Sequence, residues 1–270
     1  MPQGTDTPEG ADVEERTPME ERTPMEEPGW DADQAARYDA EHARIDTPLT
    51  VSYLAELAAG ADVLEFGVGT GRLAVPLAGK VRSVLGVDSS AEMLAAAHRT
   101  PLPGNLTLVR GDAQDWTTDR RFGLVLCVYN LLLHFTTQES QLAVVRNAAA
   151  HLAPGGSLVV ENLHPPLRAL EDGERISALQ LAGTGMGIST QRFDWKSLLL
   201  DQSVLYVDEG GHRVRRFTQR MLLPSEQDLM ARLAGLRLVK RIANWRGGSW
   251  RADSSGPAAS NVISVYRRTD

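Results

Sequence analysis

The stretch Asp62–Gly71 constrains the fold more than any other part of this sequence. The apolar residues of 63–66 have the length and composition of a short buried strand, and glycines follow at every second position, at Gly67, Gly69 and Gly71. A helical pattern begins directly after them. Strand, glycine turn and helix, in this order, bring bare backbone close to a nucleotide-like ligand in α/β proteins. Glycine suits the turn because it adopts positive φ and has no Cβ.

The spacing of these glycines and a downstream acid separate two cofactor classes. A dinucleotide fingerprint has the spacing G-x-G-x-x-G, whereas here the spacing is G-x-G-x-G and Arg72 occupies the position of the third glycine. A second predicted strand, 81–87, ends at Asp88, whose carboxylate can accept hydrogen bonds from both hydroxyls of a ribose. An ordinary strand-to-helix turn and a nicotinamide-binding Rossmann domain remain the alternatives.

Three short motifs resemble one enzyme family. The segment 65–71, Glu-Phe-Gly-Val-Gly-Thr-Gly, together with Asp88 resembles the class I S-adenosylmethionine-dependent methyltransferases. The phrase at 151–158, His-Leu-Ala-Pro-Gly-Gly-Ser-Leu, resembles the turn before the fifth strand of that family. Ala-Arg-Tyr-Asp at 36–39 resembles a motif in the leading helix of its small-molecule members. The resemblance implies a doubly wound, mostly parallel seven-stranded sheet of Rossmann-like type, with S-adenosylmethionine as cofactor and a leading helix that closes over it.

The rest of the chain alternates strand and helix, as a doubly wound parallel sheet requires. The expected strands are 63–66, 81–87, 106–110, 122–128, 157–161, 236–242 and 262–266, the last antiparallel. The expected helices are 30–59 in two pieces, 70–78 with Pro76 in its interior, 89–98, 137–152 and 224–234.

Two segments depart from this alternation. Residues 1–29 contain five prolines, a tandem Glu-Glu-Arg-Thr-Pro-Met repeat and little apolar content, so the sequence predicts a disordered acidic tail. The methyltransferase domain is then expected to span 30–270. Within it, 163–223 is expected to be an inserted antiparallel segment with strands at 189–195, 198–207 and 212–221, after a loop marked by the glycines of 183–187. This segment could cover the substrate or form a homo-oligomer contact.

The distribution of charge argues for a small-molecule substrate. Residues 1–29 hold nine acidic and two basic residues, and the remaining 241 residues hold 26 of each. A neutral body offers no basic stripe for nucleic acid. No apolar run is long enough to span a membrane, and the acidic N-terminus has no signal-peptide core. The single cysteine, Cys127, fits a reducing cytoplasm.

The resemblance implies a set of cofactor-binding residues at the carboxyl ends of the strands, where ligands bind in such sheets. The glycines would lie under the amino-acid part of the cofactor, Asp88 would hold the ribose, and the remaining residues would border the adenine or the methionine part. The set is Glu65, Phe66, Gly67, Gly69, Gly71, Asp88, Ser89, Met93, Asp112, Ala113, Asn130 and Leu131.

Catalytic candidates are fewer, because methyl transfer from a sulfonium mainly requires an oriented nucleophile and a dry site. A general base helps a hydroxyl or ammonium nucleophile, and His134, His164 and Tyr38 are the candidates. No metal site is expected, since the histidines lack ligand spacing and there is no second cysteine.

The sequence therefore predicts a cytoplasmic methyltransferase of class I that acts on a small molecule, of natural-product type, and binds neither nucleic acid nor membrane. Two alternatives stay open. One is a cyclase of the same fold that transfers no methyl group, and the other is a catalytically inactive, S-adenosylmethionine-binding partner subunit. The methylated atom cannot be identified from the sequence.

Overall fold

A seven-stranded sheet forms the body of the protein, in a computed structural model that describes residues 30–41, 46–164, 173–180, 185–208, 211–248, 250 and 260–269. The strand order is β10-β11-β5-β4-β1-β2-β3. All pairs are parallel except those that β11 makes with β5 and β10. The strands are β1 (Asp62–Phe66), β2 (Ser83–Asp88), β3 (Leu106–Arg110), β4 (Phe122–Cys127), β5 (Leu152–His164), β10 (Leu236–Ile242) and β11 (Ser260–Arg268). The predicted doubly wound, mostly parallel sheet is confirmed, including its antiparallel last strand.

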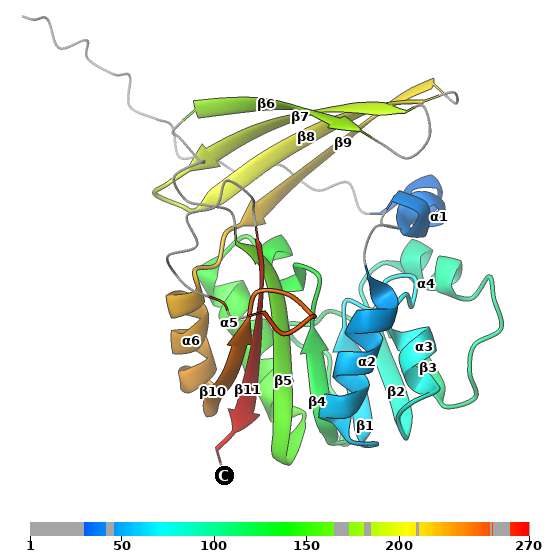
Figure 1. The fold of residues 1–270 in the computed structure, drawn as a ribbon, viewed down its shortest axis with the longest axis vertical. Helices are drawn as coiled ribbons and strands as arrows, with labels where there is room; N and C mark the ends of the chain where they lie inside the picture. Colours follow the sequence, from blue (N-terminus) through cyan, green and yellow to red (C-terminus); the bar gives the residue numbers. More distant parts are fainter. Residues whose placement is uncertain are drawn as a thin grey trace, which may run out of the picture.

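Helices cover both faces of this sheet (Figure 1). They are α1 (Ala32–Glu41), α2 (Thr47–Ala58), α3 (Ala74–Ala78), α4 (Ala91–Ala97), η1 (Leu131–His134), α5 (Gln138–Ala150) and α6 (Pro224–Leu233). Along β4, Val125 and Cys127 belong to the apolar cluster under α5 and α6, while Leu124 and Leu126 belong to the cluster under α2, α3 and α4. This alternation, with both faces buried, is why the central strands are apolar throughout.

A second, antiparallel sheet lies beyond one end of the main sheet, and α1 lies beside it (Figure 1). Its strand order is β6-β7-β8-β9. The strands are β6 (Gly173–Gln180), β7 (Met186–Asp194), β8 (Leu199–Asp208) and β9 (Gly211–Arg220). We call it the cap sheet. Phe193 and Leu200 at its root belong to the same apolar cluster as α5 and α6, so the cap sheet is packed onto the main domain.

The structure corrects three details of the sequence prediction. The cap sheet has four strands and not three, because β6 precedes the expected ones. In β6, the apolar side chain of Ile176 is 72% exposed and does not contribute to a core. Gly187, expected in a loop, lies in β7. The helix expected at 70–78 begins only at Ala74, which places Pro76 in its first turn, where a missing N–H breaks no helical hydrogen bond.

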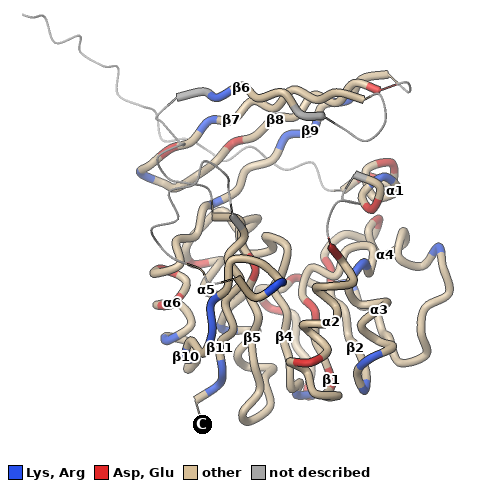
Figure 2. Tube along the Cα trace, in the orientation of Figure 1, with Lys and Arg blue, Asp and Glu red and all other residues tan. Residues whose placement is uncertain are grey.

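Acidic and basic residues are interspersed over both layers (Figure 2). In the described part of the chain, no helix is long and apolar enough to cross a membrane. Residues 1–29 lie outside the described residues, so the disordered tail stays a prediction.

Candidate active site

The glycine turn after β1 is fastened to the end of β2. Gly67 and Gly69 have φ of 69° and 55°. The N–H of Gly69 donates to Asp88 Oδ2 at 2.8 Å, and the N–H of Ser90 donates to Asp88 Oδ1 at 2.9 Å. A Cβ on Gly67 would lie 2.7 Å from a methyl carbon of Leu131. The turn therefore requires glycine both for its dihedral angles and for its close approach to the opposite wall.

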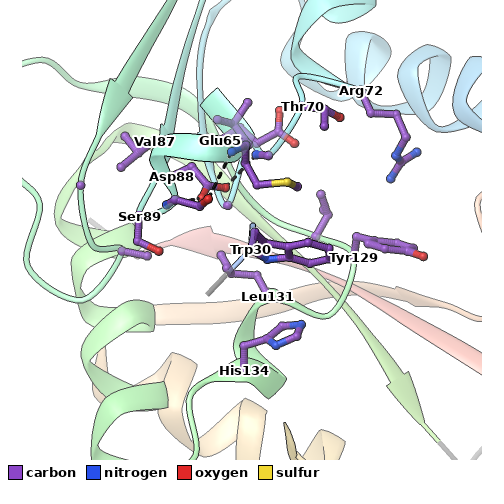
Figure 3. Close-up of a pocket in the computed structure, with 18 of the residues that line it drawn as sticks. Trp30, Glu65, Thr70, Arg72, Val87, Asp88, Ser89, Tyr129, Leu131 and His134 are labelled. Atoms are coloured by element: carbon purple, nitrogen blue, oxygen red, sulfur yellow. Dashed lines mark hydrogen bonds between the residues drawn. The ribbon is translucent and has the colours of Figure 1, made fainter. Parts of the chain in front are cut away.

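A pocket opens above this turn at the carboxyl ends of β1 to β4. Figure 3 shows Glu65, Thr70 and Asp88 on one side and Leu131 and His134 on the other, with the Trp30 indole between them. Ten of the residues predicted from the sequence line it: Tyr38, Glu65, Gly67, Gly69, Asp88, Ser89, Met93, Asp112, Ala113 and Leu131; the predicted catalytic candidate His134 lines it as well.

Four predicted residues do not line this pocket. Phe66 is fully buried and packs edge-on against Trp116. Gly71 faces Val75 of the following helix. The side chain of Asn130 accepts a hydrogen bond from the N–H of Leu163 at 2.5 Å. His164 packs against Trp250, at 6.2 Å between ring centroids. Phe66 therefore contributes to core packing, and Gly71 and Asn130 contribute to the geometry of their turns.

Glu65 is the unusual group in the wall. Its side chain is 3% exposed, and its Oε2 atom is buried without any hydrogen-bond partner. Burial raises the pKa of Glu65 to about 8, opposed by the positive charge of Arg72 and assisted by the negative charge of Asp88. A buried carboxylate oxygen without a donor is costly, so this position is suited to a ligand that brings a cationic donor.

A strained turn carries Tyr129 into the pocket. Tyr129 and Asn130 have φ of 55° and 67°, a left-handed pair without glycine. The buried side chain of Glu161 holds the turn: its Oε2 accepts from the N–H of Tyr129 at 3.1 Å, and its Oε1 accepts from Trp245 Nε1 at 2.9 Å and Asn261 Nδ2 at 2.8 Å. Glu161 ends the strand expected at 157–161, but its role in holding this turn was not predicted, because its three partners are distant in sequence.

Aromatic residues from separate elements meet at the pocket mouth. The Trp30 and Tyr38 rings pack edge-to-face with centroids 5.1 Å apart, and the Tyr38 and Tyr129 rings do so at 6.4 Å. The guanidinium of Arg72 lies 5.1 Å from the centroid of the Tyr129 ring. Trp30, Arg72 and Tyr129 all line the pocket, and none was among the predicted site residues.

The environment of Tyr38 argues against a role as general base. Burial raises the pKa of Tyr38 well above its ordinary value, with the neighbouring Tyr129 adding to the effect. At neutral pH the hydroxyl is therefore protonated and acts as a donor. Burial lowers the pKa of His164, but His164 does not line the pocket. His134 therefore remains as the candidate general base that lines the pocket.

Comparison with known proteins agrees with this geometry. Residues 63–156 match the family model of a methyltransferase domain. The chain is 28% identical over 200 residues to a cypemycin N-terminal methyltransferase from a Streptomyces species, covering 72% of this chain and 80% of the relative. It is 36% identical over 101 residues to dTDP-3-amino-3,6-dideoxy-alpha-D-glucopyranose N,N-dimethyltransferase of Streptomyces fradiae, covering 37% of this chain and 39% of the relative.

A solved structure extends the likeness to nearly the whole fold. The CcbJ methyltransferase of Streptomyces caelestis is 32% identical, with a TM-score of 0.76, and the match covers 83% of this chain and 90% of that chain. The chain belongs to the S-adenosylmethionine-dependent methyltransferases. The residues present fit this cofactor: among the described residues Glu65 Oε2 is buried without a partner, β2 ends in an acid, and a Cβ at Gly67 or Gly69 would narrow the pocket.

Proposed function

We propose that this methyltransferase transfers a methyl group to an amine nitrogen of a small secondary metabolite. The observation that carries the proposal is one pocket that is lined both by Glu65 and Asp88 and by Tyr38, Tyr129 and His134. The nitrogen acceptor is supported by two relatives, a cypemycin N-terminal methyltransferase and an amino-sugar N,N-dimethyltransferase. The single cysteine supports a cytoplasmic location.

Each wall of the pocket would bind a different portion of the cofactor. The orphaned oxygen of Glu65 would accept a hydrogen bond from the ammonium of the amino-acid moiety. Asp88 already accepts from Gly69 and Ser90 with one lone pair of each oxygen, which leaves the other lone pairs for ribose hydroxyls. The thioether and methyl groups of Met93, Ala113 and Leu131 would form the apolar walls of an adenine site.

On the acceptor side, the residues orient a nucleophile and remove a proton. The bound cofactor supplies a methyl group on a sulfonium sulfur, which is already an activated electrophile. Tyr38 and Tyr129 are protonated donors that can orient the acceptor. His134 lines the pocket and would accept the proton that an ammonium acceptor must lose before its lone pair can attack. The Trp30 indole and the cap sheet would exclude water.

A mass-spectrometric screen of candidate amines tests the proposal. The enzyme is incubated with S-adenosylmethionine and a library of amines, amino sugars and peptides, each with its hydroxyl analogue. We expect S-adenosylhomocysteine to form and an amine to gain the mass of a methyl group. Methylation of the hydroxyl analogues alone would refute the nitrogen assignment. S-adenosylhomocysteine binding without turnover of any acceptor would favour an inactive partner subunit.

We also propose that the cap sheet forms a homo-oligomer contact, as expected from the sequence. Four apolar side chains lie on its outer face, opposite the pocket: Ile176, Met186, Ile188 and Val214 are 72%, 59%, 43% and 46% exposed. Exposed apolar patches of this kind support an interface. Light scattering should give a multiple of the monomer mass, and Ile176→Lys with Met186→Lys should give the monomer; a monomeric wild type would refute the proposal.

A further inference from the structure

Arg215 of β9 lies on the face of the cap sheet that is turned toward the pocket. It pairs with Val204, which pairs with Ser189, and both partners are buried. Its neighbour Val214 points to the opposite, outer face. The Arg215 guanidinium lies 3.7 Å from the centroid of the Trp30 ring, and Trp30 lines the pocket. Arg215 therefore stands at the boundary between the cofactor pocket and the cap sheet.

Within the described ranges, the guanidinium N–H groups of Arg215 have neither a hydrogen-bond acceptor nor an ion-pair partner. Asp208, which lies on the same face of β8 as Val204, is shared by two other arginines: Arg213 at 2.6 Å and Arg37 at 3.7 Å. A guanidinium presents five donors in a planar fork. The Arg215 guanidinium is partly buried, its contacts within the described ranges are with aromatic rings, and it lies next to a ligand pocket. Its N–H groups are therefore suited to bind an oxyanion.

The groups around Arg215 add donors. The Tyr38 ring lies 5.1 Å from the Trp30 ring and 6.4 Å from the Tyr129 ring, between centroids. The positive charges of Arg215 and Arg72 act on both phenols. Burial raises the pKa of Tyr129 to about 12 against these charges, and it raises that of Tyr38 further. Both hydroxyls are thus protonated at neutral pH and can donate to an anion.

An aromatic cage for a methylated ammonium would use the same rings but does not fit here. Such a cage needs ring faces that are open to the ligand cation. Here the Arg215 guanidinium already lies over the Trp30 ring, and the Arg72 guanidinium lies 5.1 Å from the centroid of Tyr129. A ligand cation at this place would face like charge, whereas an anion would be attracted.

We propose that Arg215, with the hydroxyls of Tyr38 and Tyr129, binds an anionic group, a carboxylate or a phosphate, that the methyl acceptor carries. The proposal deepens the proposed function and rests on it, because it defines the acceptor as an amine that also bears an acidic group. The cofactor also carries an anionic group, the carboxylate of its amino-acid moiety, which is the second candidate for an anion bound near this place. Arg72 follows the glycine turn and would serve that source, whereas Arg215 comes from the cap sheet.

Inorganic phosphate is a suitable probe, because it needs no knowledge of the acceptor. Phosphate is titrated into the full-length protein saturated with S-adenosylhomocysteine, at constant ionic strength set with sodium chloride, and binding is followed by calorimetry and by tryptophan fluorescence. We expect saturable binding in the wild type, weakened at least tenfold in Arg215→Gln. Arg215→Lys should keep most of it, because the charge remains. The matched control Arg216→Gln, exposed on the outer face of the same strand, should bind phosphate like the wild type.

Three outcomes would overturn the assignment. The first is the absence of saturable phosphate binding in the wild type, and the second is equal binding in Arg215→Gln. The third is phosphate binding that S-adenosylhomocysteine abolishes, because the anion site would then belong to the cofactor. A fall in S-adenosylhomocysteine affinity or in melting temperature for both Arg215 variants would show that Arg215 serves only to hold the Trp30 ring in place, which would also contradict the assignment. The readout is independent of turnover, so failure of the amine assignment in the metabolite screen is distinguishable from failure here.

Discussion

At the residue scale, if the buried Glu65 accepts the cofactor's ammonium as proposed, cofactor binding should depend on a proton. The folded, ligand-free protein keeps this proton up to about pH 8, whereas the ordinary pKa is 4.5. Between these values the folded state binds more protons than the unfolded state, so the contribution of Glu65 to stability is complete below pH 4.5 and is lost as the pH rises to 8. An ammonium beside Glu65 favours the carboxylate, so binding releases the proton.

We therefore expect S-adenosylhomocysteine binding at pH 7 to release up to about one proton. Calorimetry in buffers of different ionisation enthalpy measures this number. Glu65→Gln should remove the release and weaken binding. A proton count that is the same in the wild type and in Glu65→Gln would show that Glu65 does not meet the ammonium.

Asp88 joins the glycine turn to the end of β2, and we propose that it also holds the ribose, so its loss should act on binding. Asp88→Ala should weaken S-adenosylhomocysteine binding by about 1–3 kcal/mol, the loss of two buried hydrogen bonds, as measured by calorimetry. Asp62→Ala is the matched control, because Asp62 begins β1 at the opposite end of the strand and bonds Ser83. Unchanged affinity in Asp88→Ala, or equal losses in both variants, would contradict the assignment.

His134 lies in η1, directly after the strained turn, and lines the pocket. If His134 accepts the acceptor's proton, His134→Ala should lower kcat by about 10²–10⁴-fold with cofactor affinity retained. His212→Ala, exposed on β9, serves as the control and should leave kcat unchanged. Steady-state kinetics with the acceptor found in the screen measures both. Cofactor affinity that falls in step with kcat would mean that His134 is structural.

At the scale of elements, the turn after β4 depends on one side chain of the neighbouring strand. Two consecutive left-handed residues without glycine are costly, and Glu161 of β5 offsets the cost with three hydrogen bonds, one of them to the N–H of Tyr129. All three partners are donors, so an acceptor-only carboxylate suits the position. This arrangement explains how β5, which does not itself line the pocket, fixes the Tyr129 ring in it.

Glu161→Gln should therefore destabilise the fold by about 1–3 kcal/mol, because an amide N–H₂ would face a donor, and thermal unfolding measures the change. Glu92→Gln, at an exposed residue of α4 that accepts a hydrogen bond from the Ser90 hydroxyl, should change stability little. An unchanged melting temperature for Glu161→Gln would refute the role of Glu161 as the anchor of the turn.

At the scale of the whole molecule, α1 connects the two sheets around the pocket. Thr70 of the glycine turn donates to Asp39 at 2.7 Å, Arg37 pairs with Asp208 of the cap sheet at 3.7 Å, and Arg215 stacks on Trp30. These contacts support the leading helix as a cover over the cofactor site. They begin at Trp30, immediately after the acidic segment 1–29.

Deletion of residues 1–29 should thus leave the melting temperature and S-adenosylhomocysteine affinity the same within error, since that segment has little apolar surface to bury. Thermal unfolding and calorimetry of the two proteins test this. A deletion that begins one residue later, removing Trp30 as well, should weaken S-adenosylhomocysteine binding. A clear loss of stability on the shorter deletion would show that the acidic segment docks on the domain.

The sequence by itself determined the features that depend on neighbouring residues. The glycine spacing at 67–71, Asp88 at the end of a strand and the alternation of strands and helices predicted the fold and the cofactor, and most of the site residues predicted with them line the pocket, because each is a local pattern of backbone geometry and burial. The ends of β10 were also predicted from its local pattern.

Only the tertiary structure decided which distant side chains meet. Glu161 holds Tyr129 through partners up to 100 residues away, and Trp30, Arg72 and Arg215 converge from a segment before α1, the glycine turn and the cap sheet. No spacing in the sequence encodes these contacts, since they arise when separate elements pack at one edge of the sheet. The same packing turned His164 away from the pocket and put Phe66 into the core, where local pattern alone had placed both at the site.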